Sequence, residues 1–526
     1  MTLKVSAKDV NPKQVGSFAA APRFLKLLSV FTLTLVLIPL AYLAIRSSEN
    51  GWGSFTSIIL RPRSVQTLFT SLALSLTVAI GALLIGLVVA LILGKTNIML
   101  RRLLLVLMPL PLAIPSYVIA YSYLTINPFL RGFWISAIIL ILATFPFVAI
   151  PTYALIRKIN LNQEEVARTL GLSPLGVLMK VIWPQVRVAS VAGALLSALY
   201  ALSDFGTVSL MRLDTFTRVI YTMYRATFDR SGAASLGIML LAVSLFVVFL
   251  ERRGRGLVVP SSGQGRSGGV LAIGNYRHLA FLFVLSIYFV TLVIPGYVLI
   301  SRSISVGTSI NIGNLISVIS NTALVAFLGA SVALLLTIPV GILSARFKSR
   351  FAQVIENSLL VTHALPGVVV GLALVALGAR YLSGLYQTIY LLAFAYALLF
   401  IANSLGSVRS SLEKIPMRLD EVARSLGQTY SQTLRRVILP IATPGIFAGW
   451  LLVFVTAMKE LPATLMLKPT GFETLSTSLW TATSISQYSQ AAPFALALVL
   501  IASIPSYLLN RPNLAEREVM RENKDL

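Results

Sequence analysis

Two acidic residues, Asp204 and Glu460, lie in strongly apolar stretches of the sequence and are 256 residues apart. A carboxylate inside a membrane is costly and usually faces a pathway or a partner. Carboxylate oxygen atoms are also the ligands that hard metal cations prefer. We therefore predict that both residues line a translocation pathway and contact a metal cation transiently. The alternative is structural pairing, of Glu460 with Lys459 and of Asp204 with an arginine of residues 211–233.

Few other residues suit catalysis or a resident metal site. The 526 residues include no cysteine and only two histidines, which excludes disulfides, thiolate metal sites and cysteine nucleophiles. The tripeptide Gly94-Lys95-Thr96 has the residues that end a phosphate-binding loop, but that loop needs a glycine at position 89, which is Val89. We expect no catalytic residue, no tightly bound cofactor and no ATP hydrolysis by this chain itself.

The composition places these residues in a membrane. The chain is 56% hydrophobic and 12% charged, with a mean hydropathy of +0.85. Apolar runs of roughly 20 residues match a bilayer core of about 30 Å. We predict an all-α polytopic membrane protein with about twelve transmembrane helices. The predicted spans are residues 24–45, 67–93, 103–125, 133–156, 188–210, 234–251, 279–301, 321–345, 354–378, 387–408, 444–467 and 491–510.

The charges predict the orientation of these spans. With a cytoplasmic N-terminus, 31 of the 43 Lys and Arg residues fall on the cytoplasmic side, which is the usual bias of membrane proteins. Both termini are then expected in the cytoplasm. The net charge of +25 does not indicate nucleic-acid binding, because the basic residues are scattered among the loops and form no face that could follow phosphates.

One polar stretch occurs twice, at Glu165–Pro184 and at Glu421–Pro440. The copies are 256 residues apart, and the same offset relates Asp204 to Glu460. Six spans per copy give both halves the same orientation. We predict two parallel six-helix repeats, residues 1–251 and 278–526, joined by a cytoplasmic linker of residues 252–277.

Each repeated stretch has the residues of a helix–turn–helix. In the first copy, Asn162 is expected to cap a short helix, Gly171 to end it in a left-handed conformation, and Ser173 to cap a second helix. Gly427 and Thr429 are expected to do the same in the second copy. A short helix outside the membrane on both halves favours partner binding, and the alternative is an ordinary ordered loop.

The shared pattern Glu-x-Ala-x₃-Gly-x₉-hydrophobic-x-x-Pro resembles the EAA loop of ABC-type importer permeases. It covers residues 162–187 and 413–443, with Val166 and Val422 where that family usually has alanine. The resemblance implies that each loop docks on an ATP-hydrolysing subunit, so two copies of that subunit are expected. It assigns ATPase coupling to Glu165, Ala167, Arg168, Gly171, Glu421, Ala423, Arg424 and Gly427.

The stretches Ala201–Tyr221 and Met458–Trp480 resemble fused iron(III) importer permeases of the bacterial inner membrane. This resemblance implies Fe³⁺ as the transported substrate and a periplasmic iron-binding protein as a partner. Fused thiamine permeases share the architecture, so thiamine stays an alternative substrate. An ion-coupled secondary transporter is the alternative of another class, because it would also have two halves and intramembrane carboxylates.

The predicted outer loop after the fifth span is rich in arginine, against the usual charge bias. Such exposed charges mainly steer association and set its register. We predict that this loop docks the binding protein, and the alternative is solvated arginines paired with Asp214 and Asp229. The four arginines are Arg212, Arg218, Arg225 and Arg230.

Overall fold

The computed structural model describes residues 21–49, 51–159, 161–227, 229–255, 274, 276–306 and 311–509. Within these ranges the regular secondary structure is helical, which confirms the predicted all-α class. In the part of the chain that the structure describes, nine helices are long and apolar enough to cross a membrane, and a bent pair makes a tenth. Two shorter apolar helices, Gly367–Tyr381 and Tyr488–Ser503, bring the total to one segment for each of the twelve predicted spans.

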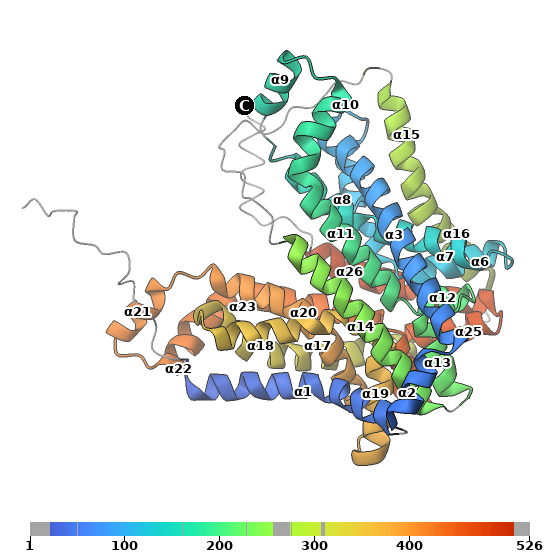
Figure 1. The fold of residues 1–526 in the computed structure, drawn as a ribbon, viewed down its shortest axis with the longest axis vertical. Coiled ribbons are helices and arrows are strands. Elements are labelled where there is room, and N and C mark those ends of the chain that lie inside the picture. Colours follow the sequence, from blue (N-terminus) through green and yellow to red (C-terminus); the bar gives the residue numbers. More distant parts are fainter. Residues whose placement is uncertain are drawn as a thin grey trace, which may run out of the picture.

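The first half contains fourteen helices in the described residues (Figure 1). They are α1 (Arg23–Ser48), α2 (Gly51–Ile59), α3 (Pro62–Lys95), α4 (Arg101–Leu107), α5 (Leu110–Ala113), α6 (Ser116–Ile126), α7 (Phe133–Thr144), α8 (Pro146–Ile156), α9 (Leu161–Thr169), α10 (Pro174–Val177), α11 (Trp183–Ser203), α12 (Gly206–Leu210), α13 (Phe216–Arg225) and α14 (Arg230–Arg255).

The second half repeats this order. Its helices are α15 (Tyr276–Tyr288), α16 (Ile294–Val306), α17 (Ile312–Arg346), α18 (Arg350–Leu360), α19 (Gly367–Tyr381), α20 (Ile389–Glu413), α21 (Arg418–Ser425), α22 (Tyr430–Thr433), α23 (Leu439–Met458), α24 (Pro462–Leu467), α25 (Leu475–Ser484) and α26 (Tyr488–Leu509). The predicted linker is shorter at both ends than expected, since α14 extends to Arg255 and α15 begins at Tyr276. Most of it lies outside the described residues.

Four predicted spans are not continuous helices. The span at 103–125 bends by 90° between α5 and α6, and the span at 354–378 is interrupted between α18 and α19. Both breaks end at a proline, Pro115 or Pro366, and the residue before each is extended. A proline disfavours helical backbone in the residue before it, which accounts for both breaks. The spans at 188–210 and 444–467 are interrupted at Asp204 and Glu460.

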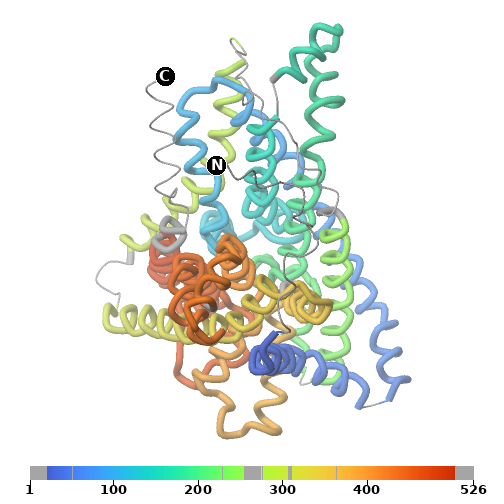
Figure 2. Tube along the Cα trace, turned by 90° about the vertical axis from the view of Figure 1, so that its left-hand side faces the viewer, coloured from blue at the N-terminus to red at the C-terminus, as the bar shows by residue number. Residues whose placement is uncertain are grey.

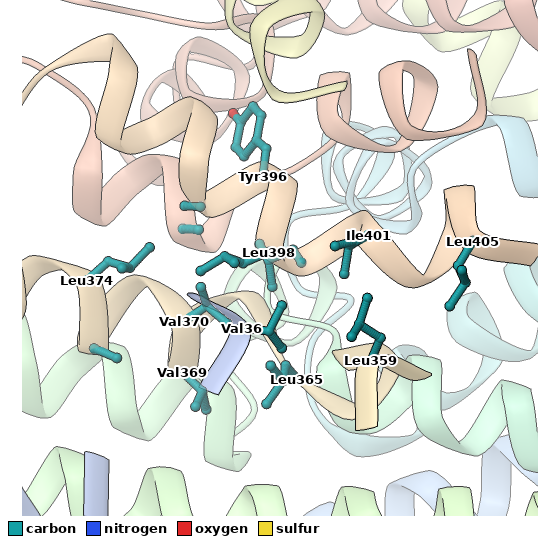
Figure 3. Close-up of a cluster of buried hydrophobic side chains, with 14 of the residues drawn as sticks. Val36, Leu359, Leu365, Val369, Val370, Leu374, Tyr396, Leu398, Ile401 and Leu405 are labelled. Carbon is teal, nitrogen blue, oxygen red and sulfur yellow. The ribbon is translucent and has the colours of Figure 1, made fainter. Parts of the chain in front are cut away.

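The first helix of each half packs on the other half. Helix α1 contacts α17, α18 and α19, and Figure 2 shows it (dark blue) beside the yellow and orange helices of the second half. Figure 3 shows Val36 of α1 among side chains of α19 and α20, such as Val369 and Leu398. In return, α15 packs on α3 and α4, where Tyr288 donates a hydrogen bond to the Leu104 carbonyl oxygen at 3.1 Å. The core therefore joins the two halves.

Candidate functional site

Asp204 ends α11 and caps the short helix α12. Its Oδ1 accepts hydrogen bonds from the backbone N–H groups of Thr207 at 2.9 Å and Val208 at 3.3 Å. Its Oδ2 accepts a hydrogen bond of 2.5 Å from the Ser116 hydroxyl at the start of α6. The residue is 8% exposed. A carboxylate at a helix N-terminus is stabilised by the unpaired N–H groups and by the helix dipole.

Glu460 has the equivalent place between α23 and α24. Its carboxylate accepts hydrogen bonds of 3.1 Å from the backbone N–H groups of Ala463 and Thr464, and one of 3.0 Å from the Thr464 hydroxyl. It is also 8% exposed. The sequence offset therefore corresponds to an equivalent structural position: both carboxylates are buried caps of the short helix that follows a long one.

Neither carboxylate forms an ion pair with any residue that the structure describes. Lys459, the expected partner of Glu460, instead donates a hydrogen bond of 3.1 Å to the Leu112 carbonyl oxygen in the first half. The arginines of residues 211–233 do not pair with Asp204 in the described chain either. The alternative of structural ion pairing is therefore not what the structure records.

Tyr117 lies between the two capping sites. Its side chain packs against Gly206, two residues after Asp204. Its hydroxyl group bonds the Lys459 carbonyl oxygen at 3.2 Å and the Ser476 hydroxyl at 3.0 Å, both in the second half. The carboxylates thus occupy the layer where the halves meet, but they are separated by a tyrosine and form no hydrogen bond with each other among the described contacts.

The two capping sites differ in one matched pair of residues. Ser116 and Gly367 both begin the helix after a break, directly behind Pro115 and Pro366. A Cβ atom on Gly367 would overlap Glu460 Oε1. The shorter Asp204 thus faces a serine, and the longer Glu460 faces a glycine that leaves room for the extra methylene group.

The repeated stretches fold as predicted helix–turn–helix units. Gly171 and Gly427 end α9 and α21 with positive φ angles of 82° and 78°. Ser173 accepts a hydrogen bond from the Gly176 N–H at 3.2 Å and caps α10, and Thr429 forms a capping box with Gln432. The prediction for Asn162 was wrong, because α9 already begins at Leu161 and Asn162 lies inside it.

One face of each short helix is exposed and the opposite face is buried. Ala167 and Ala423 are each 6% exposed and pack inward. Outward-facing residues in the first copy are Glu165, Val166, Arg168 and Leu170, and in the second copy Glu421, Val422 and Leu426. The side chain of Arg424 lies outside the described part of the structure. Each unit therefore presents apolar and charged residues to its surroundings.

A buried ion pair ties each short helix to the end of a long one. Lys95, the last residue of α3, pairs with Glu164 of α9, and both side chains are at most 5% exposed. Arg346, the last residue of α17, lies 3.8 Å from Asp420 of α21. Neither pair was predicted from the sequence, in which Lys95 was considered only for phosphate binding. The available signal was that Glu164 and Asp420 are also 256 residues apart.

The four predicted docking arginines do not form one group. Arg212 and Arg218 line a shared cavity with Arg131, which the sequence analysis did not single out. Arg225 and Arg230 are exposed and do not line that cavity. Arg218 pairs with Asp214, as the alternative expected. Asp229 instead accepts a hydrogen bond of 2.8 Å from the Gly232 N–H at the start of α14.

Figure 1 shows how these features are arranged in the molecule. Helices α9 and α21 lie at separate ends, at the top and at the left, whereas α12, α13 and α25 lie together at the right. The helix that begins at α10 and continues through α11 joins the first short-helix unit to Asp204. Each carboxylate thus lies at the end of its half that is remote from the helix–turn–helix unit. The arginines lie at the same end of the first half.

Comparison with known proteins gives a consistent family. The family described as "Binding-protein-dependent transport system inner membrane component" matches residues 86–253 and again residues 337–511. The Fe(3+)-transport system permease protein FbpB 2 of Haemophilus influenzae is 32% identical over 499 residues, which cover 93% of this chain and 98% of that protein. The two family matches fall one in each predicted half.

Shorter relatives resemble part of the chain. The sulfate transport system permease protein CysT of Salmonella typhimurium is 26% identical over 42% of this chain and 87% of its own length. A probable molybdenum ABC transporter permease protein of Haloferax volcanii is 30% identical over 43% of this chain and 87% of its own length. A solved bacterial homologue of the human peptide transporters PepT1 and PepT2 aligns with a TM-score of 0.15 and 12% identity, too low to bear on the fold.

Proposed function

Because the chain belongs to the family of binding-protein-dependent transport system inner membrane components, we propose that it is the two-halved permease of an ATP-driven importer for ferric iron. The observation that carries the proposal is the similarity to FbpB 2, which includes both halves and nearly the whole of that protein. The relatives named for sulfate and molybdenum are similar over less than half of this chain.

The helix–turn–helix units are the proposed contacts with a separate ATPase, one copy per half. Their outward faces combine Glu165 or Glu421 with exposed apolar residues, a composition suited to a protein groove. In this proposal both units and both termini are cytoplasmic, and the arginine-lined cavity faces the periplasmic iron-binding protein. Closure of the ATPase would move α9 and α21, and the buried ion pairs would transmit this movement to α3 and α17.

Asp204 and Glu460 are the proposed pathway residues, with ferric ion as cargo. An ion leaving its binding protein loses oxygen ligands, and two buried carboxylates at one level of the membrane offer replacements in a poorly solvated space. Each carboxylate is held by neutral donors only in the described chain, so its negative charge is not cancelled by a neighbouring cation. Two carboxylates without a full ligand shell suit passage better than tight binding.

The first prediction concerns iron flux through these residues. In vesicles containing the permease, the ATPase and the binding protein, Asp204→Asn and Glu460→Gln should each reduce iron uptake by tenfold or more, while ATPase assembly is retained. Glu49→Gln is the matched control, because this acid pairs with Arg46 and Arg380 and belongs neither to the carboxylate sites nor to the arginine-lined cavity. Full uptake by the double variant Asp204→Asn, Glu460→Gln would rule out the pathway role.

Substrate identity needs a separate assay. Purified binding proteins loaded with ferric ion, thiamine, sulfate or molybdate should be supplied in turn to the same vesicles. We expect ATP-dependent uptake with the ferric protein alone. Uptake with another loaded protein would keep the importer class and replace the cargo, whereas uptake without any ATPase would indicate a secondary transporter.

A further inference from the structure

A cavity of about 230 Å³ lies where the two halves meet, between the loop before α7, helices α12 and α13, and helix α25. The first half contributes three arginines, Arg131, Arg212 and Arg218. The second half contributes Trp480 and several hydroxyl groups, among them that of Thr483. No Asp or Glu is among the described residues that line it.

Two buried donors of the cavity residues have no acceptor. Arg131 Nε and Trp480 Nε1 form no hydrogen bond with the residues that the structure describes. An unpaired buried donor is destabilising, more so when it carries charge, and such groups are rare in native proteins. One of these donors belongs to each half, and both residues line the cavity.

Two residues at the cavity have a left-handed backbone conformation. Arg212 and Ser486 have positive φ angles of 56° and 63°, a conformation that residues other than glycine rarely adopt. They are two of four such residues in the described chain, and both line this cavity. Each follows a helix and ends it: the N–H of Leu213 bonds the Val208 carbonyl oxygen, and the N–H of Gln487 bonds the Ala482 carbonyl oxygen, so two left-handed helix endings form this part of the cavity wall.

The arginines of this cavity are not repeated at the equivalent positions of the second half. The position equivalent to Arg212 is Lys468, which pairs with Glu473, and the position equivalent to Arg218 is Thr474. The arginine group is therefore a single site. Arg218 is already paired with the exposed Asp214, whereas Arg131 and Arg212 form no ion pair among the described contacts. The charge and donors of these two arginines are suited to a ligand with several negatively charged oxygen atoms.

We propose that this cavity binds a small free oxyanion of the phosphate or carboxylate class. A compact anion fits a cavity of this volume and would contact lining residues of both halves. The role in transport rests on the proposed function: a ferric ion takes oxygen ligands, so an oxyanion here would accompany the ion as it is released. Phe205, next to Asp204, contacts Tyr221 at 4.9 Å and Trp480 at 6.3 Å between ring centroids, and so lies between the cavity and the carboxylate.

The test measures anion binding to the full chain in lipid nanodiscs, without ATPase, binding protein or iron. Isothermal titration with phosphate and with citrate should show saturable binding that weakens with added salt. Arg131→Gln and Arg212→Gln should each weaken it by about tenfold or more, because a hydrogen bond to a charged group is lost. Arg61→Gln is the matched control, an exposed arginine that does not line the cavity.

Trp480→Phe provides a second variant that removes the N–H donor but keeps an aromatic side chain, and it should weaken anion binding severalfold, with the thermal unfolding midpoint measured alongside to show that the protein stays folded. Absence of saturable binding, or equal binding by all variants, would overturn the proposal. A third result would also overturn it: no anion binding by the unmodified protein, together with loss of binding-protein association in the arginine variants. The cavity would then receive a carboxylate of the partner protein. The assay needs neither iron nor ATP, so its failure leaves iron import itself untouched.

Discussion

At the scale of single residues, the two carboxylate sites show how a membrane protein keeps a charge without a counter-ion. Asp204 and Glu460 replace the missing helical acceptors at the start of α12 and α24. Hydroxyl groups complete each shell, from Ser116 in one half and from Thr464 in the other. The same chemistry is therefore built twice, with different side-chain lengths.

This difference in side-chain length predicts that substitutions at Gly367 and Glu460 affect stability in a coupled way. Gly367→Ser should destabilise the protein by about 1–3 kcal/mol, because the new side chain overlaps Glu460. Adding Glu460→Asp should recover most of this loss, since it recreates the Ser116–Asp204 arrangement. The measurement is a double-mutant cycle on thermal unfolding in detergent.

The reciprocal pair serves as the control for that cycle. Ser116→Gly combined with Asp204→Glu should also be more stable than the sum of the two single changes predicts. Additive effects in both pairs would show that the two sites do not match side-chain size in this way.

At the scale of elements, the ion pairs between long and short helices have the clearest mechanical meaning. Lys95–Glu164 and Arg346–Asp420 connect α3 to α9 and α17 to α21, in equivalent places of the two halves. Breaking a buried pair leaves an uncompensated charge, whereas replacing both partners with apolar residues is often neutral.

We therefore expect Lys95→Met alone to destabilise the protein by about 3–5 kcal/mol and to lower transport-coupled ATPase activity. The double variant Lys95→Met, Glu164→Leu should regain stability but not full coupling, because the directional contact is gone. Unfolding midpoints and ATPase stimulation by the loaded binding protein are measured together. Arg101→Met is the control, a partly buried arginine near the end of α3 that bonds only backbone carbonyl oxygens in the described contacts. If the double variant recovers both readouts, the pair serves stability alone.

Element by element, the sequence was most informative where a local rule decides the structure. Positive φ at Gly171 and Gly427 and the caps at Ser173 and Thr429 follow from residue type alone. Pro115 and Pro366 are expected from the sequence to kink their spans, and the structure has a 90° bend at the first and an interrupted helix at the second. The partners of Glu164 and Asp420 could not be predicted, since an ion pair between distant segments depends on how the helices pack.

At the scale of the whole molecule, the exchanged first helices explain why two similar halves form one protein. Hydropathy predicted α1 and α15 as spans but gave no information on which half each would join. In the structure, α1 buries residues such as Leu25 and Val36 in a core shared with the second half. Each half is therefore completed by a helix of the other.

This arrangement predicts that the halves assemble without a peptide connection. Chains of residues 1–262 and 263–526, expressed together, should form a complex that is purified by a tag on either one and transports iron. Each chain expressed alone should be degraded or aggregate, because its exchanged helix lacks its packing surface. The unbroken chain is the control, and stable accumulation of a single half would contradict the expectation.

Two of the three π-helical turns in the described chain occupy equivalent places in the two halves. Leu178–Ile182 and Leu434–Ile438 lie between the second short helix and the long helix of each half, and Pro184 or Pro440 follows two residues later. The wider turn suits proline, which lacks an N–H group and crowds the carbonyl four residues earlier. Such a turn holds one residue more than an α-helical turn, and one residue is about 100° of rotation. The extra residue in the π-helical turn thus rotates the second short helix by about 100° around the axis of the long helix, relative to an uninterrupted α-helix. The same rotation occurs in both halves, because each has one such turn ahead of its proline.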